Sequence, residues 1–218
     1  MPFANRTQAG KELAKALSKY EDKRVVILAL PRGGVPIARE VAIHLHAALD
    51  LILVRKIGLP LQPELAMGAV VDGPHPLTVR NEDVIRISGI TRAAFDAVRD
   101  RELAEIRRRR TAYLHGRPHA DLKEKIVIVI DDGIATGATM RAALRAVRQQ
   151  HPSKLVLAVP VAPTSTIADL SGDADEIICL EQHDEFGAIG MFYADFAQVS
   201  DKEVRDALAD LLPRVNQL

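Results

Sequence analysis

The sequence predicts an α/β domain with a mostly parallel sheet of about five strands and helices on both faces. Short apolar runs without polar alternation recur along the chain, which is typical of strands buried on both faces. Stretches with helical periodicity separate these runs, as in parallel βαβ architectures. The length of 218 residues suits one domain. Folding of such a chain buries about 70% of the unfolded surface, which is enough for a core without disulfides.

The first half of the chain alternates between apolar helical patterns and short β-rich runs. Glycine and proline punctuate it after the first strand and again over 57–68, which we expect to be a loop. The expected elements are a helix over 7–19, a strand at 25–30, a helix carrying Ile37, Val41 and Leu45, a buried strand at 51–54, and short strands at 70–71 and 77–79.

The second half begins with a long polar helix over 91–114, for which Thr91 is the candidate N-cap. Its arginine run, 107–110, lies in the last turns, where cations suit the helix dipole, and we expect a solvated face rather than a phosphate patch. The remaining expected elements are a strand at 126–130, a helix carrying Met140 to Val147, a strand at 155–159, a helix over 164–170, a strand at 177–180 and a helix over 201–212.

Composition narrows the class of protein. The chain has 29 Lys and Arg against 29 Asp and Glu, which argues against a basic nucleic-acid coat. The balance hides a division, since residues 1–168 carry 26 basic against 17 acidic residues and 169–218 carry 3 against 12. A single cysteine, Cys179, excludes a disulfide framework. No apolar run is long enough for a membrane span and no leader pattern is evident, so we expect a cytoplasmic protein that binds neither membrane nor nucleic acid.

The strongest chemical signal follows the strand at 126–130. Two adjacent carboxylates, Asp131 and Asp132, stand at the end of this strand, where open α/β sheets bind ligands. A loop of small residues then opens a helix, so that backbone N–H groups and the helix dipole can hold an anion. Carboxylates beside a phosphate suit a ligand that also has hydroxyls or a metal, such as a phosphorylated sugar. The loop residues are Ala135, Thr136, Gly137, Ala138 and Thr139.

This stretch resembles the phosphoribosyl pyrophosphate (PRPP) motif of type I phosphoribosyltransferases. The similarity is greatest to bacterial stand-alone members whose base is unassigned. The resemblance implies transfer of the 5-phosphoribosyl group of PRPP to a purine-like nitrogenous base, with release of pyrophosphate and with Mg²⁺. It implies that Asp131 and Asp132 hold the ribose hydroxyls and that 135–139 hold the 5-phosphate. It implies no direct metal ligand, since Mg²⁺ is bound through PRPP, with Asp131 and Asp132 as the candidate contacts. A homodimer is common in the family. Walker A and GxGxxG loops are absent from the sequence.

Two other segments are similar to pyrophosphate-binding parts of that family. Arg32 and Gly33 follow the first strand in a loop that is often built on a cis non-proline peptide. Arg55 and Lys56 are expected at the end of the second strand, where cations neutralise a leaving group. Phe192 and Tyr193, in an aromatic cluster near the C-terminus, are candidates for stacking the base, and a small satellite core is the alternative.

The resemblance also predicts how the single domain, 1–218, is organised. A core over 24–56 and 124–181 is expected to bear a lid or insert over 57–120 and a tail or hood over 182–218. Two other functions stay open at this point. The chain can be a PRPP- or nucleotide-sensing module without catalysis, or a hydrolase that passes the phosphoribosyl group to water.

Overall fold

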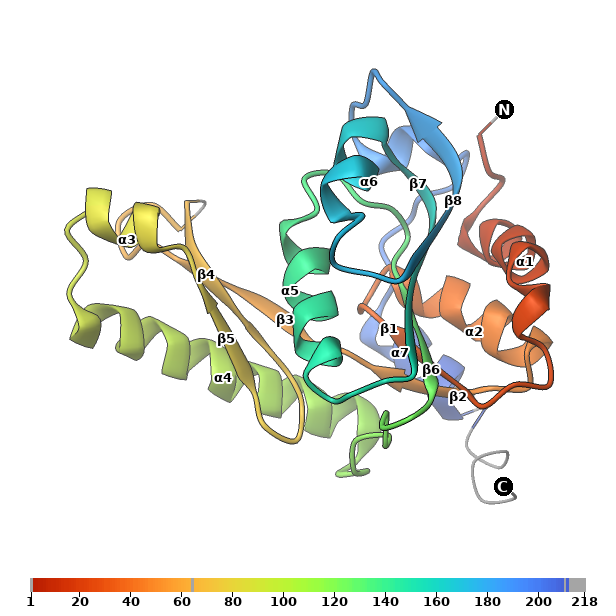
Figure 1. Ribbon diagram of the computed structural model, residues 1–218, viewed down its shortest axis with the longest axis horizontal. Helices are drawn as coiled ribbons and strands as arrows, with labels where there is room; N and C mark the ends of the chain where they lie inside the picture. The colour runs from red at the N-terminus through yellow and green to blue at the C-terminus, as the bar shows by residue number, and fades with distance from the viewer. Residues whose placement is uncertain (1, 64, 210, 212–218) are drawn as a thin grey trace.

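A five-stranded parallel sheet forms the centre of the molecule (Figure 1). The computed structural model describes residues 2–63, 65–209 and 211. The expected fold class is confirmed, because every neighbouring pair of strands in this sheet is parallel. The strands, in spatial order, are β2 (Ala48–Leu51), β1 (Val25–Ala29), β6 (Ile126–Ile130), β7 (Lys154–Pro163) and β8 (Glu176–His183).

Helices cover both faces of this sheet because successive strand residues point to opposite sides. Ile27 and Ile128 belong to a core shared with α1 (Arg6–Ala16), α2 (Gly34–His44) and α7 (Asp201–Ala209). Their neighbours Leu28 and Val129 belong to a second core, shared with α5 (Ala138–Arg148) and α6 (Thr164–Leu170). The unbroken apolar runs of the strands therefore supply two cores.

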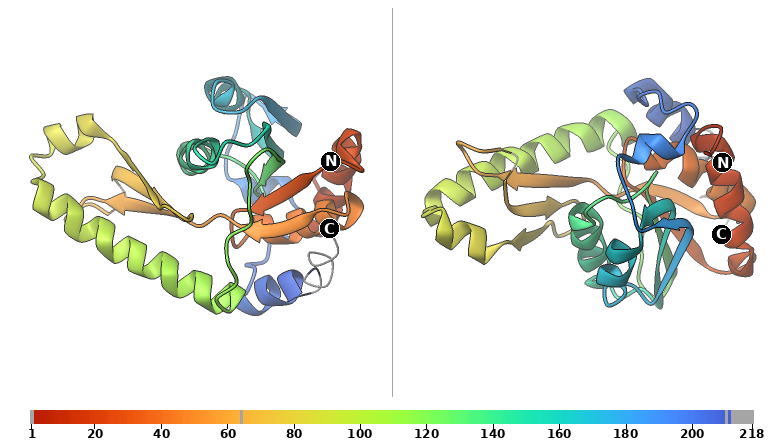
Figure 2. Two further views of the ribbon diagram at one scale, coloured as in Figure 1. Left: turned by 60° about the horizontal axis from the view of Figure 1, so that its bottom comes forward. Right: turned by 90° about the horizontal axis from the view of Figure 1, so that it is seen from above.

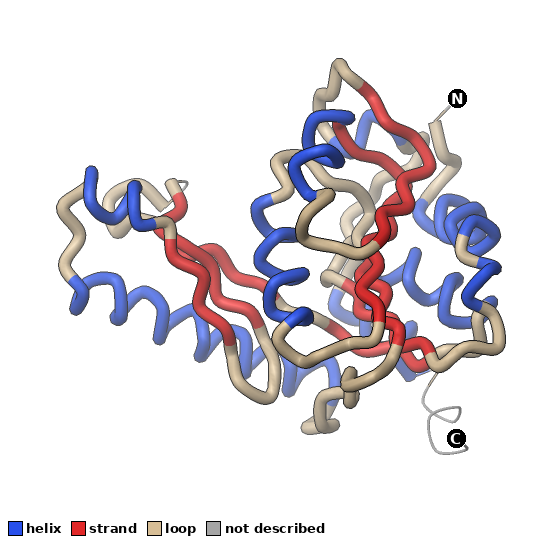
Figure 3. The backbone as a smooth tube through the Cα atoms, in the orientation of Figure 1, coloured by secondary structure: helices blue, strands red, loops and turns tan. Residues whose placement is uncertain are grey.

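A second sheet projects from the core together with a long helix (Figure 2). We call residues 54–114 the arm. The sheet is antiparallel, and Figure 3 shows its strands as a group apart from the central ones. Apolar residues of this sheet, such as Met67, pack with Phe95 and Ile106 of the helix in the larger core. The elements of the arm are β3 (Val54–Gly58), β4 (Ala66–Val71), β5 (Leu77–Arg80), α3 (Glu82–Ile87) and α4 (Arg92–Leu114).

The arm corrects two expectations. The strand expected at 51–54 does not exist as one element, since Leu51 ends β2 in the central sheet and Val54 begins β3 in the other. The loop expected over 57–68 is shorter, because β3 extends to Gly58 and β4 begins at Ala66. Antiparallel pairing stabilises these segments despite their glycine content, and local composition does not reveal a partner strand.

The N-cap expected for the long polar helix, α4, is confirmed, because the Thr91 side chain accepts a hydrogen bond from the amide of Ala94 at 3.2 Å. The helix expected over 201–212 is described as α7 to Ala209, and positions 210 and 212 lie outside the described residues. Short 3₁₀ turns complete the described chain at η1 (Ser18–Tyr20) and η2 (Ile189–Phe192).

Among the described residues, no helix is both long enough and apolar enough to cross a bilayer.

Candidate active site

The candidate site lies where the connections of the central sheet diverge. Strands β1 and β6 are neighbours, but the chain after β1 continues to β2 on one side and the chain after β6 continues to β7 on the other. Such a switch point leaves a crevice at the carboxyl ends of the two strands, where open α/β sheets bind ligands. The loop 31–33 and the loop 131–137 both begin there.

Asp131 and Asp132 lie side by side at this switch point. The amide of Asp132 donates to Oδ1 of Asp131 at 2.8 Å. Burial, together with the neighbouring charge of Asp132, holds the pKa of Asp131 well above its usual range. Two adjacent carboxylates in this environment resist carrying two negative charges at once. A cation or a hydroxyl donor is the complement that such a pair needs.

Arg6 supplies a cation to Asp132, and sequence reasoning missed it. Its Nε and Nη2 lie 2.8 Å from Oδ2 of Asp132, and both side chains are nearly buried, at 11% and 12% exposed. The guanidinium stacks on the Phe196 ring at 3.8 Å and donates from Nη1 to the carbonyl of Ala197 at 2.8 Å. Nothing local marks this residue, because it is one of several polar side chains in the first helix.

Gly33 brings the first loop against these carboxylates. A Cβ at this position would stand 2.0 Å from Oδ2 of Asp132, so only glycine lets the main chain approach so closely. The peptide bond between Pro31 and Arg32 is cis. The side chain of Arg32 extends to α7, where its Nη1 lies 3.6 Å from Oδ1 of Asp201. The main chain of the loop thus faces the acidic pair, while its cation faces another element.

The loop of small residues leads into α5 as expected. Gly137 adopts φ +74 immediately before the helix, a left-handed conformation that favours glycine. The carbonyl of Ala135 accepts from Thr166 Oγ1 of α6 at 2.8 Å, which fixes the loop to the core. Thr136 and Thr139 are exposed, so the loop amides and hydroxyls face an open space.

That open space is a cleft of about 570 Å³ between the arm and α5. Its walls are formed by the loop of small residues (135–139), by the sheet of the arm and by the outer face of α5. Asp131 and Asp132 lie outside its lining, so the cleft adjoins the acidic pair without containing it. The polar and charged lining residues are Lys56, Arg80, Asn81, Glu82, Asp83, Thr136, Thr139, Arg141 and Arg145.

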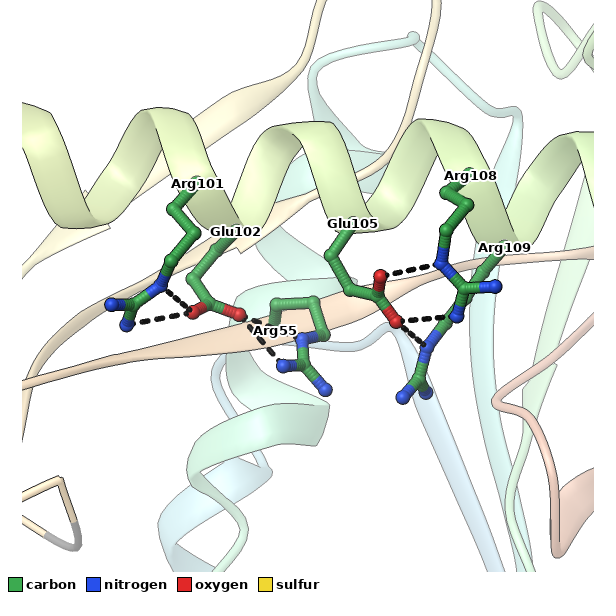
Figure 4. A network of polar contacts seen from close by, with 6 residues as sticks. All are labelled: Arg55, Arg101, Glu102, Glu105, Arg108 and Arg109. Atoms are coloured by element: carbon green, nitrogen blue, oxygen red, sulfur yellow. Dashed lines mark hydrogen bonds and ion pairs between the residues drawn. The ribbon is translucent and has the colours of Figure 1, made fainter.

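Arg55 and Lys56 do not end a strand of the central sheet, because both lie within β3 of the arm. Arg55 donates from Nε and Nη2 to Oε2 of Glu102 at 2.9 and 2.8 Å (Figure 4). Glu102 is 7% exposed, so this pair ties β3 to α4. Lys56 lines the cleft with Thr136, where it can reach an anion held by the loop.

The aromatic cluster near the C-terminus packs on the acidic loop. The Tyr193 hydroxyl donates to the carbonyl of Asp132 at 2.6 Å, and burial raises the pKa of this phenol. Phe192 is partly exposed and stacks on Phe186 with ring centroids 4.8 Å apart. Tyr193 therefore positions the acidic loop, while the partly exposed Phe192 packs on Phe186 and also on His183, whose ring centroid lies 4.5 Å away.

The N-terminal segment completes this region. The amide of Phe3 donates to the carbonyl of Phe192 at 2.8 Å, and the amide of Ala194 donates back to Phe3 at 2.8 Å. The Phe3 and Tyr193 rings pack with centroids 5.5 Å apart. We call residues 2–6 and 186–197 together the hood. It brings the N-terminal segment and the segment after β8 to the acidic pair and explains how Arg6 reaches Asp132.

Comparison with known proteins assigns this arrangement to a family. A model of the phosphoribosyl transferase domain matches residues 4–196, a range that contains the acidic pair, both loops and most of the hood. The chain belongs to the phosphoribosyl transferase domain family.

Relatives cover most of the chain. Two Mycobacterium tuberculosis proteins, from strains CDC 1551 / Oshkosh and H37Rv, carry phosphoribosyl transferase as a provisional name and are 46% identical over 202 residues. The match covers 93% of this chain but 45% of theirs, so this chain spans less than half the length of those relatives. The crystal structure of TT1426 from Thermus thermophilus is 39% identical, with a TM-score of 0.83, and the match covers 97% of this chain and 99% of that one. The AQ2163 protein of Aquifex aeolicus, 14% identical with a TM-score of 0.51 over 93% of this chain and 84% of its own, shares the fold.

The donor set of this phosphoribosyl transferase domain fits Mg²⁺ when a phosphorylated substrate supplies the remaining ligands. Within 2–63, 65–209 and 211, no three His, Cys, Asp or Glu side chains gather as a metal cage. Asp131 and Asp132 offer two carboxylates. Magnesium is usually held by one or two carboxylates together with substrate phosphates and water. The pair is therefore suited to a metal that arrives with its substrate.

Proposed function

We propose that this chain transfers the 5-phosphoribosyl group of PRPP to a nitrogen of a purine-like base and releases pyrophosphate. The observation that carries this proposal is the placement of Asp131 and Asp132 at the β1/β6 switch point, directly before the anion-binding loop that opens α5. Membership of the phosphoribosyl transferase family supports it. Nucleotide metabolism as the setting and a homodimer stay predictions from the family resemblance, and a cytoplasmic location stays a prediction from the sequence.

Two parts of the site bind different groups of PRPP. The amides of 135–139 and the Thr136 and Thr139 hydroxyls bind the 5-phosphate at the N-terminus of α5. Asp131 and Asp132 accept hydrogen bonds from the 2- and 3-hydroxyls of ribose. Their negative charge also favours the positive charge that develops on the sugar ring as the bond to pyrophosphate lengthens. Asp131 and Asp132 would hold Mg²⁺ together with the substrate phosphates, and the metal would supply positive charge to offset the negative charge of the pyrophosphate.

The leaving group lies between the first loop and the arm. The main chain at Arg32 and Gly33 faces the acidic pair, and Lys56 faces the phosphate loop from the arm, so the two flank the pyrophosphate. Arg55 acts indirectly, because Glu102 holds its guanidinium and fixes β3 beside α4. Closure of the arm over this space excludes water, the competing nucleophile.

The hood is the proposed place for the base. Phe192 offers a partly exposed ring for stacking, whereas the Tyr193 hydroxyl donates a hydrogen bond to the carbonyl of Asp132. In the reaction, the C1–O bond to pyrophosphate breaks and a bond from C1 to the base nitrogen forms. The nitrogen then loses its proton to solvent or to the departing pyrophosphate. We assign no side chain as a dedicated base, and positioning and charge stabilisation drive the step.

A single assay separates the proposed transferase from the alternatives. The chain is mixed with PRPP and Mg²⁺, alone and with adenine, hypoxanthine, guanine or xanthine, and pyrophosphate release is measured. Release that depends on a base supports the transferase. Release at the same rate without a base indicates a hydrolase, and tight binding of PRPP without release indicates a sensor.

A further inference from the structure

The arginine run of α4 occupies three different environments. Arg107 is exposed. Arg110 is nearly buried in ion pairs with the core. Arg108 is also exposed and Arg109 is partly buried. Both bind Glu105, which accepts from Nε and Nη2 of Arg108 and from Nε of Arg109 at 2.7 to 2.9 Å (Figure 4). The expected solvated face therefore holds for Arg107 and Arg108 but not for Arg110.

Arg108 and Arg109 line a small cavity at the junction of α4, α7 and the first loop. Its volume is about 150 Å³, and all of its lining side chains are polar: Arg32, Arg108, Arg109, Tyr113 and Asp201. Three guanidiniums converge there. The two from α4 together carry ten N–H donors, which exceeds the roughly four acceptor positions that the Glu105 carboxylate offers. This cavity has an excess of positive charge and of hydrogen-bond donors.

Arg32 connects this cavity with the candidate active site. The main chain after Arg32 lies against the acidic pair, as the close approach of Gly33 to Asp132 shows. Its side chain crosses to α7, where Nη1 is 3.6 Å from Asp201. Arg32 therefore contributes its main chain to the loop beside the acidic pair and its side chain to the cavity.

Asp201 provides the negative charge of the cavity in this structure. Its Oδ1 accepts a hydrogen bond from the Tyr113 hydroxyl at 2.7 Å. Its side chain is 58% exposed and that of Arg32 is 34% exposed, so the long contact between them contributes little. Phosphate oxygens form stronger, bidentate contacts with guanidinium groups than this carboxylate does. A phosphate group can therefore displace Asp201 towards solvent.

We propose that Arg32, Arg108 and Arg109 form a second anion subsite that accepts inorganic pyrophosphate as it leaves the active site. The three guanidiniums and the cavity that they line are the evidence for an anion subsite. Only the identity of the anion as pyrophosphate rests on the proposed function. The subsite assigns a role to the arginines of α4 that neither the PRPP motif nor the phosphate loop includes.

Calorimetric titration with sodium pyrophosphate tests the subsite. Arg108→Gln combined with Arg109→Gln is expected to weaken binding by about tenfold or more, since charge-assisted contacts from two guanidiniums are lost. Arg107→Gln removes the same charge from an exposed position of the same helix and is expected to change the affinity by less than about twofold. Asp201→Asn removes the competing carboxylate and is expected to strengthen binding by about threefold to tenfold.

Two results would overturn the subsite. One is an unchanged pyrophosphate affinity in the double variant while its circular dichroism spectrum matches that of the wild type. The other, which decides the matter if the double variant does not fold, is an unchanged or lower affinity in Asp201→Asn. Titration of the same proteins with PRPP and Mg²⁺ tests the proposed function separately. If the wild type does not bind PRPP, the proposed function fails, while the effects of Arg108, Arg109 and Asp201 on pyrophosphate still decide the subsite.

Discussion

Arg6 Nε and Nη2 both lie 2.8 Å from a single oxygen of Asp132, although 126 residues separate the two in sequence. The contact joins the first helix to the acidic pair that follows β6. It also requires the hood, since Phe196 stacks on the guanidinium and Ala197 accepts from it. The chain therefore carries its own cation for one of its two neighbouring carboxylates.

We predict that Arg6→Gln lowers the free energy of unfolding by about 3 kcal/mol, because it leaves a nearly buried carboxylate without its counter-charge. Arg6→Lys keeps the charge but loses the planar fork, so it should fall between the wild type and Arg6→Gln. Urea denaturation at pH 7 measures both. Lys11→Gln, at an exposed position of the same helix, serves as the control and should shift stability by less than about 0.5 kcal/mol. Equal effects of Arg6→Gln and Lys11→Gln would show that the Arg6–Asp132 contact has no energetic weight.

Gly33→Ala should displace the Asp132 carboxylate, because the added methyl group would stand 2.0 Å from its Oδ2. Overpacking of this kind costs about 1 to 3 kcal/mol of stability. We also expect PRPP affinity to fall by about tenfold, as the acidic pair loses its position. Gly172→Ala is the matched control, since no described atom lies within 4 Å of its added methyl group. Denaturation and PRPP titration that do not distinguish the two variants would contradict the close packing of the first loop on Asp132.

Arg110 should matter far more for stability than Arg107. Its Nη1 lies 2.8 Å from Oδ2 of Asp72 and its Nη2 lies 3.4 Å from Oδ2 of Asp50, both of which are buried. Burial lowers the pKa of the adjacent His119, whose Nε2 lies 3.7 Å from Oδ1 of Asp72. Arg110→Gln should therefore cost about 3 to 5 kcal/mol. Arg107→Gln should stay within about 0.5 kcal/mol. Thermal or urea unfolding that ranks them equally would refute this division of the arginine run.

Glu176 gives the fold an acid-sensitive contact. Burial opposes its ionisation, but hydrogen bonds from Lys154, Lys19 and Tyr20 prevail and lower its pKa to about 2 from 4.5. The ionised carboxylate therefore adds stability above pH 4.5, and this contribution is lost as the pH falls towards 2. Glu176→Gln should reduce the free energy of unfolding by about 1 to 2 kcal/mol at pH 7. The difference from the wild type should shrink steadily between about pH 5 and pH 2. A difference that does not depend on pH would mean that the carboxylate is not ionised by these partners.

The central sheet and its acidic loop could be predicted because their signals are local. Three adjacent segments carry them: the apolar strand 126–130, the pair Asp131–Asp132 and the small residues before α5. The conformation of each segment follows from its own residues. The same holds for Thr91, whose capping role depends on the three residues after it. Periodicity and capping are short-range properties, so a single sequence reveals them.

The features that could not be predicted depend on partners distant in sequence. Arg6 reaches Asp132 only because the segment around Phe3 pairs with the chain at Phe192. Composition predicts a loop for part of the arm, but the antiparallel pairing of β3, β4 and β5 decides its structure more than composition does. Arg55 has the residue type of a phosphate ligand, but Glu102 on α4 binds its guanidinium. Each of these is a tertiary contact that overrides a local preference.

The most direct test of the central claim is calorimetric titration of the chain with PRPP in the presence of Mg²⁺, compared with a variant carrying both Asp131→Asn and Asp132→Asn. The wild type should bind one PRPP per chain. The variant, if its circular dichroism spectrum shows a folded protein, should bind about 100-fold more weakly or worse, since it has lost both carboxylates that face the ribose and the metal. Equal affinity of the two folded proteins for PRPP would contradict the assignment of this acidic pair as the centre of the site.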